Sequence, residues 1–284
     1  MIKRHSANAP GNWYIDTRCT DCSAARTVAP GLIVERDGQS VFARQPETPE
    51  DIRMAWRARL LCPTASVRTM RPAAMPEGVF PEVMTKSVYR LGYNADSSYG
   101  AHSFLIRREA GNAMVDAPRF TRAVTARLEE WGGLADILLT HRDDVADAGA
   151  YAKHFGARVS IHKCDRAAAP FADNILEGEE PIALGSDLTA IPVPGHTKGS
   201  VAYLYDGRCL FSGDSLAWSF EKDDLTAWRD FCWYSWPAQT ESLARLLDFS
   251  FAWVLAGHGG SKELAPADMR VRLAALIERM KSEE

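Results

Sequence analysis

The fold of this chain is decided by the stretch Ile191-Pro-Val-Pro-Gly-His-Thr-Lys-Gly-Ser200, where an apolar strand runs directly into a glycine and a histidine. Three other short apolar strands end in a similar way, at Thr140-His-Arg-Asp-Asp144, Ser212-Gly-Asp214 and Ala256-Gly-His258. Rigid strands position side chains, and glycines let the backbone turn sharply beside a ligand. Imidazole nitrogens and carboxylate oxygens bind zinc or iron. The four strand ends therefore predict one metal site.

Taken in this order, the four elements resemble the metallo-β-lactamase fold superfamily over residues 84–284, including its glyoxalase II-like metallo-hydrolases. The usual signature of that superfamily is T-H-x-H-x-D-H, then G-H-T-x-G-S, then G-D, and finally a late G-H. The second element is intact as Gly195–Ser200, the third is Gly213-Asp214, and the fourth is Gly257-His258. The resemblance implies an α+β fold, an αββα sandwich with the site at one edge.

The first element departs from this signature. A version with a ferredoxin-like front half has the motif H-R-D-D-V-A-D-H, and this chain resembles it as His141-Arg-Asp-Asp-Val-Ala-Asp147-Ala148. By this resemblance, one metal ion would be bound by His141, His196 and Asp214, with Asp143 in a position that normally holds histidine.

A second metal ion would be bound by Asp147, the bridging Asp214 and His258. Ala148 leaves this second set one ligand short, so we expect its affinity to be weaker. Asp147 is also the expected catalytic residue, which would orient the water or accept its proton. Asp144 either substitutes for Asp147 or caps a helix that begins near residue 145, and we favour the cap.

The first part of the chain carries a different pattern. Cys19-Thr-Asp-Cys22 and Cys62-Pro63 resemble the motif of single-cluster ferredoxins, C-x2-C-x2-C followed later by C-P. The third position is Ala25, although a 4Fe–4S cluster needs four thiolates. We therefore expect a degenerate ferredoxin-like domain without an iron–sulfur cluster; a labile or three-iron cluster is the alternative.

Breaker residues separate the two parts. Pro72, Pro76, Gly78 and Pro81 fall within residues 71–81 and indicate a linker. We predict a ferredoxin-like domain over residues 1–75 and a metallo-β-lactamase-like domain over residues 82–284. In the first, Pro49 and the acidic residues after it predict a helix that ends before Pro63.

Composition limits the classes of partner. The 284 residues carry 33 basic and 37 acidic side chains, a net charge of −4, which argues against a general nucleic-acid binder. No apolar run approaches the ~18 residues of a membrane span. The N-terminus has no apolar segment typical of a secretory signal. We expect a cytoplasmic protein with a small-molecule substrate and neither nucleic acid nor membrane as partner; a homo-oligomer stays open.

These patterns favour a metal-dependent hydrolase of a small ester, thioester or lactone, which would use one or two divalent zinc or iron ions to activate water. Whether it is an enzyme depends on the altered first motif. The alternative is a non-catalytic or redox-linked descendant of the fold. The aromatic stretch from Trp218 to Trp236 is either an ordinary packed cluster or a wall for an apolar substrate beside the metals.

Overall fold

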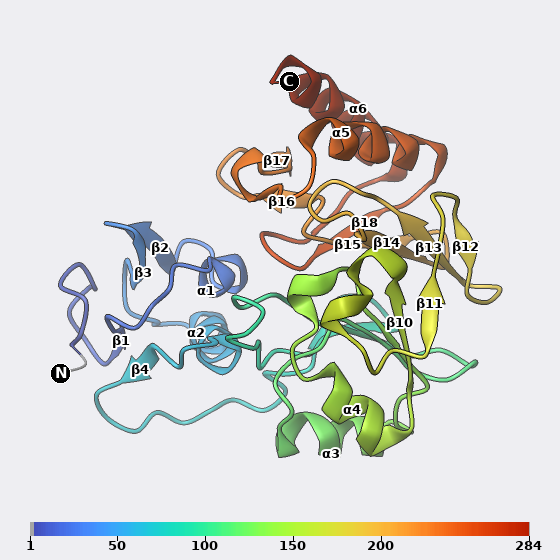
Figure 1. Ribbon diagram of the computed structural model, residues 1–284. Coiled ribbons are helices and arrows are strands. Elements are labelled where there is room, and N and C mark those ends of the chain that lie inside the picture. Colours follow the sequence, from blue (N-terminus) through green and yellow to red (C-terminus); the bar gives the residue numbers. More distant parts are fainter. Residues whose placement is uncertain (1–2, 284) are drawn as a thin grey trace.

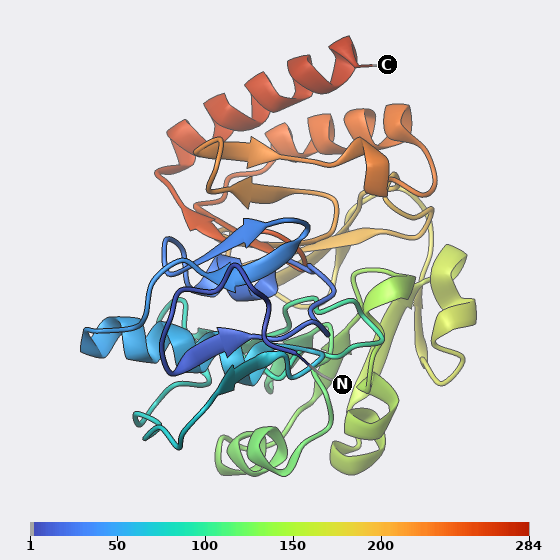
Figure 2. The ribbon, with the colours of Figure 1, turned by 90° about the vertical axis from the view of Figure 1, so that its left-hand side faces the viewer.

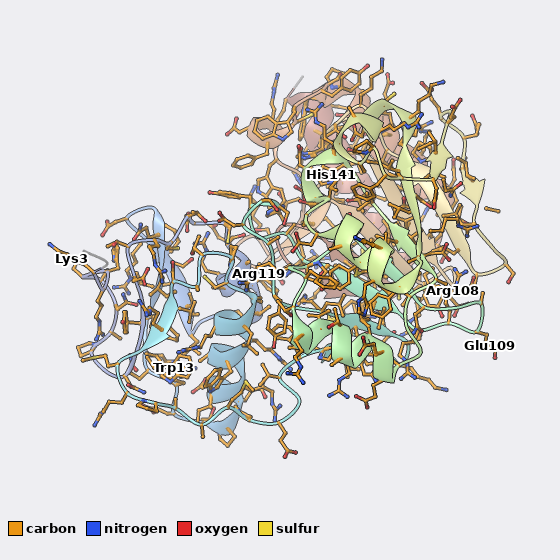
Figure 3. All side chains as sticks on the ribbon, turned by 60° about the horizontal axis from the view of Figure 1, so that its bottom comes forward. Lys3, Trp13, Arg108, Glu109, Arg119 and His141 are labelled. Carbon is orange, nitrogen blue, oxygen red and sulfur yellow. The ribbon has the colours of Figure 1, made fainter. Side chains whose placement is uncertain are left out.

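The computed structural model describes residues 3–283. A small front domain, blue in Figure 1, lies beside a larger domain that contains two stacked sheets. His141 lies inside the larger domain and Trp13 inside the front one, as Figure 3 shows. Arg119 lies where the domains meet, and its guanidinium donates to the carbonyl of Leu60 (3.5 Å). None of the described helices is long and apolar enough to cross a membrane.

The front domain has two small antiparallel sheets and two helices around one apolar core. Its elements are β1 (Trp13–Ile15), α1 (Ala24–Val28), β2 (Ile33–Arg36), β3 (Gln39–Phe42), α2 (Pro49–Leu61) and β4 (Val67–Thr69). The expected helix is α2. Thr48 caps it by accepting from the backbone N–H of Asp51, whose carboxylate in turn accepts from the N–H of Thr48.

The first sheet of the larger domain is mixed and has seven strands. In spatial order they are β11 (Asn174–Leu176), β10 (Arg158–His162), β9 (Asp136–Leu138), β8 (Ala113–Val115), β7 (Phe104–Ile106), β6 (Val88–Arg90) and β5 (Glu82–Val83). The second sheet is also mixed, with β12 (Ile182–Ala183), β13 (Leu188–Pro192), β14 (Val201–Tyr205), β15 (Cys209–Gly213), β18 (Trp253–Ala256) and β19 (Lys262–Glu263).

Helices cover the outer face of each sheet, so the expected αββα sandwich is confirmed (Figures 1 and 2). The helices are α3 (Arg122–Glu130) and α4 (Ala148–Phe155) on the first sheet, and α5 (Trp236–Arg245) and α6 (Pro266–Ser282) on the second. Separate apolar cores lie between α3/α4 and the first sheet, between the two sheets, and between the second sheet and α5/α6. Between the sheets, the rings of Phe104 and Phe211 lie 5.5 Å apart.

Two helices begin at other residues than the sequence predicts. The sequence pattern predicts a helix around residues 240–248, but α5 begins at Trp236, because Ser235 caps it by accepting from the N–H of Ala238. We expected another over residues 145–155, but α4 begins at Ala148, after Ala146 with its left-handed φ of +39°. The hairpin of β16 (Ala217–Ser219) and β17 (Asp224–Thr226) was not predicted.

Candidate metal centre

Three side chains from both sheets converge at one edge of the sandwich. His141 follows β9 of the first sheet, while His196 follows β13 and Asp214 follows β15 of the second. Each offers one ligand atom, and these atoms lie within 4.8 Å of one another. The Nε2 atoms of His141 and His196 are each 3.7 Å from Oδ2 of Asp214. Both nitrogens are buried without a hydrogen-bond partner among the described residues, so both can bind a metal ion.

A hydrogen-bond chain orients the first of these histidines. The hydroxyl of Thr140 donates to Oδ2 of Asp116 (2.8 Å), and the hydroxyl oxygen Oγ1 of Thr140 lies 2.9 Å from Nδ1 of His141. Because the Thr140 hydroxyl donates its only proton to Asp116, its oxygen Oγ1 accepts a hydrogen bond from Nδ1–H of His141. The proton on Nδ1 leaves a lone pair on Nε2, directed toward Asp214. This is the tautomer that a metal ligand needs.

A second group shares Asp214. Asp144, Asp214 and His258 also bring one ligand atom each within 4.8 Å of one another. Nδ1 of His258 lies 2.9 Å from Oδ2 of Asp214, while its Nε2 faces the carbonyl of Tyr99 at 3.3 Å. Both ring nitrogens of His258 therefore donate, Nδ1 to the Asp214 carboxylate and Nε2 to the carbonyl of Tyr99, and loss of the Nδ1 proton would make Nδ1 a metal ligand. Both carboxylate oxygens of Asp144 are buried and lack a partner among the described residues.

The charges of these groups suit a bound cation. Burial, together with the nearby Asp214 carboxylate, raises the pKa of Asp144 well above its usual range. Burial lowers the pKa of His141 to about 4, so this imidazole is neutral. The pKa of Asp214 is low although burial opposes this, because His258, His141 and His196 surround it. Buried carboxylates without partners are costly, and a divalent cation would remove that cost. The donor set therefore fits one or two metal ions.

Asp143 lies at the open side of the first group. Its Oδ2 is 3.5 Å from Nε2 of His196 and 3.9 Å from Nε2 of His141, but its side chain is 44% exposed. The neighbouring imidazoles of His196 and His141 hold the pKa of Asp143 below its usual range. Asp143 is therefore an ionised carboxylate in contact with solvent beside the metal ligands.

Known proteins match portions of this chain. The family of the 4Fe–4S single cluster domain of Ferredoxin I matches residues 15–69. Hydroxyacylglutathione hydrolases of Acidiphilium cryptum and Fuscovulum blasticum are each 36% identical, over 119 and 120 residues. These alignments cover 40% of this chain and 49% and 47% of the relatives, so the chain spans about half the length of the curated relatives it matches.

Solved structures share the sandwich. A metallo-β-lactamase from Hirschia baltica aligns with a TM-score of 0.53 and 17% identity, over 69% of this chain and 96% of that one. A subclass B3 metallo-β-lactamase of Bradyrhizobium japonicum aligns with a TM-score of 0.51 and 15% identity, over 71% and 92%. The larger domain of this chain therefore has the metallo-β-lactamase fold. The chain carries an N-terminal ferredoxin-type domain, as the resemblance implied.

In the metallo-β-lactamase domain, the residues after His141 differ from our expectation. Asp147 does not reach either ligand group; its Oδ2 accepts from the N–H of Phe120 at 2.7 Å. Ala148 is fully buried in the apolar core between α4 and the first sheet. Asp144 does not cap a helix, because its carboxylate has no hydrogen bond among the described residues. Asp144 thus stands where we expected Asp147.

The sequence could not show this arrangement, because spacing does not reveal the local backbone. Residues 142–144 form a short 3₁₀ turn, which brings Asp144 toward His141, at 4.0 Å between Oδ2 and Nε2. The left-handed Ala146 then redirects the chain before α4 begins. The signal in the sequence was the additional carboxylate of Asp144, which we had named as a possible substitute for Asp147.

The three cysteines of the ferredoxin-type domain line one small cavity together with Ala25. Cys19, Cys22 and Cys62 are all free thiols, and the N–H of Ser66 donates to Sγ of Cys62 at 3.2 Å. Burial raises the pKa of Cys22 to about 11. The cavity offers three thiols where a 4Fe–4S cluster takes four, since Ala25 has no donor atom.

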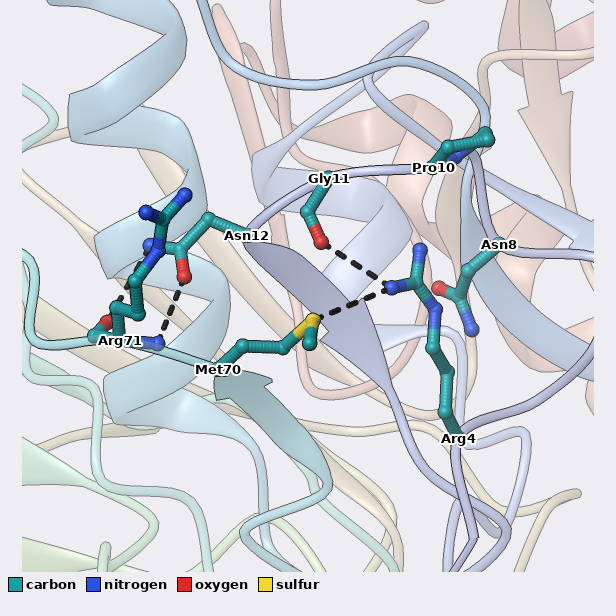
Figure 4. A pocket seen from close by; sticks show the side chains of 7 residues that line it. All are labelled: Arg4, Asn8, Pro10, Gly11, Asn12, Met70 and Arg71. Atoms are coloured by element: carbon teal, nitrogen blue, oxygen red, sulfur yellow. Dashed lines mark hydrogen bonds between the residues drawn. The ribbon is translucent and has the colours of Figure 1, made fainter.

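A wider hollow lies elsewhere in the front domain, between the N-terminal segment and the end of β4 (Figure 4). Its polar groups are already paired: Arg4 donates to the carbonyl of Gly11 (3.1 Å), and the N–H of Arg71 donates to Oδ1 of Asn12 (2.8 Å). The hollow contains no cluster of ionisable ligands, and we assign it no role in the chemistry.

Proposed function

We propose that this protein is a metal-dependent hydrolase that cleaves a small thioester, or a related ester or lactone, with activated water. The observation that carries the proposal is the pair of buried, unpartnered Nε2 atoms of His141 and His196, which face the carboxylate of Asp214. A divalent ion bound there would lower the pKa of a water molecule and polarise the carbonyl oxygen of the substrate.

The protein's own residues would take distinct parts in this reaction. His141, His196 and Asp214 would hold one ion, and Asp144, Asp214 and His258 the other. Asp116 and Thr140 would hold His141 in its ligand tautomer. Our sequence-based hypothesis gave the role of proton acceptor to Asp147, which is engaged with Phe120. Asp143 is better placed for that role, since it is ionised, half-exposed and beside His196.

The thioester class is favoured by the sequence relatives, which are named hydroxyacylglutathione hydrolases. Since the chain spans only about half of them, their substrate is not carried over with the fold. We propose a small-molecule substrate and a cytoplasmic location, without nucleic acid or membrane as partner. The net charge of −4 supports the exclusion of nucleic acid.

For the ferredoxin-type domain we propose that no stable four-thiolate cluster forms, because Ala25 replaces one ligand. Protein purified without oxygen should then be colourless. Four irons beyond those of the metal centre, with a broad absorption band near ~400 nm, would contradict this. Restoring the thiol with Ala25→Cys is the matching gain-of-function variant.

Elemental analysis joined to a thioesterase assay tests the hydrolase. Protein purified without chelator should contain zinc or iron and release thiol from acyl thioesters. The double variant His196→Ala with Asp214→Ala should lose both the metal and the activity. The exposed His154, which pairs with Glu129 on the outer surface, supplies a matched control as His154→Ala. Full metal content in the double variant would overturn the site assignment.

A further inference from the structure

The aromatic stretch after Asp214 divides into two kinds of residue. Trp218 and Trp236, the latter at the start of α5, are buried in the core that α5 and α6 form with the second sheet. In contrast, Phe231, Trp233 and Tyr234 are 56%, 57% and 49% exposed. Large aromatic side chains normally bury most of their surface, and a group of exposed ones marks a binding surface. The short segment 231–234 therefore needs a separate explanation.

This segment is firmly attached to the ligand loop. The N–H of Trp233 donates to the carbonyl of His196 at 2.9 Å, and the N–H of Tyr234 to the carbonyl of Gly195 at 3.2 Å. The thiol of Cys232 also donates to the carbonyl of Gly195, at 3.1 Å. Because three consecutive residues are held in this way, two by the backbone and one by its side chain, the rings are exposed on a fixed support.

The exposed rings lie directly beside the metal ligands. The centroid of the Trp233 ring is 6.2 Å from that of His196, and the Phe231 ring is 6.1 Å beyond it, edge to face. On the other side of the centre, the half-exposed Tyr99 ring is 6.2 Å from that of His258. Lys198 lies over the Tyr234 ring at 5.8 Å, so a positive charge stands at the outer edge.

We propose that Trp233, with Phe231 beside it, is the platform for an aromatic acyl group of the substrate; this inference rests on the proposed thioesterase function. The reacting carbonyl must lie at the metal ligands, and the centroid of the Trp233 ring is 6.2 Å from that of the ligand His196. A ring joined to the carbonyl carbon through one methylene group can reach the Trp233 ring. Stacking on a fixed indole would stabilise such a group, whereas an acetyl group would gain little.

The test compares two substrates that differ only in the acyl group, the phenylacetyl and acetyl thioesters of one small thiol. With the full chain loaded with zinc, Trp233→Ala should lower kcat/KM for the phenylacetyl thioester by about tenfold and for the acetyl thioester by less than about twofold. Trp233→Phe should retain most of the preference. Phe171→Ala, at an exposed ring packed against Gly149, is the matched control and should change neither value. Equal losses on both thioesters, or no loss, would overturn the platform.

A binding measurement separates this inference from the proposed function. The ketone in which a methylene group replaces the thioester sulfur of the phenylacetyl compound cannot be hydrolysed, and calorimetry reports its affinity. If the ketone binds the unmodified protein at least about tenfold more tightly than Trp233→Ala, but neither thioester is cleaved, the platform stands and the thioesterase proposal fails. If thioesters are cleaved but the ketone binds both proteins equally, or neither, the platform is wrong.

Discussion

Asp144 is a residue that lowers the stability of the fold and at the same time offers a ligand to the candidate metal centre. Its carboxylate is 1% exposed, has no hydrogen-bond partner among the described residues and shares its surroundings with the carboxylates of Asp214 and Asp116. Such a group destabilises the fold unless a cation joins it. Residues that lower stability without evident compensation are typical of functional sites.

We therefore expect Asp144→Asn to separate metal binding from stability. Losing a carboxylate ligand should weaken the second metal position by at least about tenfold. The metal-free variant should be as stable as the parent or more so, because it no longer buries an unpaired carboxyl group. Metal titration and urea unfolding of metal-free protein measure the two effects. In the matched variant Asp147→Asn, the amide oxygen still accepts from Phe120, so both quantities should stay unchanged; a loss of metal from that variant would restore Asp147 as a ligand.

Ala148→His provides a second residue-level test. The family resemblance implied that a histidine here would complete the second metal set. In the structure, however, Ala148 is fully buried among apolar side chains of α4 and the first sheet. The larger, polar imidazole should lower the free energy of unfolding by about 1–3 kcal/mol without raising metal stoichiometry. Elemental analysis that showed an additional bound ion would contradict the observed register.

His102 should make the protein sensitive to acid. It is fully buried, with Nδ1 3.1 Å from the side-chain amide of Asn94 and Nε2 3.0 Å from the hydroxyl of Thr27. Burial, with Arg90 nearby, holds the pKa of His102 well below its usual range. Below about pH 6.5 the unfolded chain therefore binds a proton that the folded protein excludes. As the pH decreases, the free energy of unfolding decreases by up to about 1.4 kcal/mol per pH unit. Urea unfolding between pH 7.5 and 5.5 should show this decrease. In His102→Gln, the part of the decrease that comes from protonation of His102 should be absent.

At the level of elements, the sequence was sufficient where local chemistry sets the structure. The capping box at Thr48 and Pro49 places α2, and the Gly-His and Gly-Asp strand ends bring His196, Asp214 and His258 to one edge. The sequence was insufficient where a single backbone dihedral angle decides which carboxylate lies at the candidate metal centre. The left-handed Ala146 moves the start of α4 and exchanges Asp147 for Asp144, and nothing in an alanine indicates that conformation.

Gly195 is where two elements depend on the absence of a side chain. A Cβ at this position would lie 2.2 Å from Cβ and 2.5 Å from Cα of Gln239 in α5. Because part of this contact is backbone, it can be relieved only by shifting α5 or the ligand loop. We expect Gly195→Ala to lower stability by about 1–3 kcal/mol and to weaken metal binding. The matched change Gly149→Ala, in helix α4 against the side chain of Phe171, should be close to neutral. Equal unfolding energies for the two variants would show that α5 moves freely.

At the level of the whole molecule, residues 94–102 connect the two candidate sites. The carbonyl of Tyr99 faces Nε2 of His258 at 3.3 Å, while its hydroxyl donates to the carbonyl of Thr20, between the first two cysteines. The N–H of His102 donates to the carbonyl of Gly257 (2.7 Å), and its ring contacts Thr27 of α1. The domains therefore meet through the segment that also supports His258.

Gly100 lies at the centre of this contact. Its φ is +86°, and a Cβ there would lie 2.9 Å from Sγ of Cys22 and 3.1 Å from Cγ of Pro63. Gly78, in the segment between β4 and β5, has a φ of +64° but no atom within 4 Å of such a Cβ. Both alanine variants should incur the cost of about 1–2 kcal/mol for a left-handed residue, but only Gly100→Ala should also separate the domains.

We expect Gly100→Ala to lower Tm further than Gly78→Ala and to expose Cys22, whose burial now raises the pKa of its thiol to about 11. Labelling with a thiol reagent, mapped by mass spectrometry, should then modify Cys22 faster in this variant alone, whereas the exposed Cys164 should react at the same rate in both. Because Tyr99 precedes Gly100, the position at His258 should also bind metal less tightly. Equal Tm values and equal labelling of Cys22 would show that the two domains do not depend on this contact.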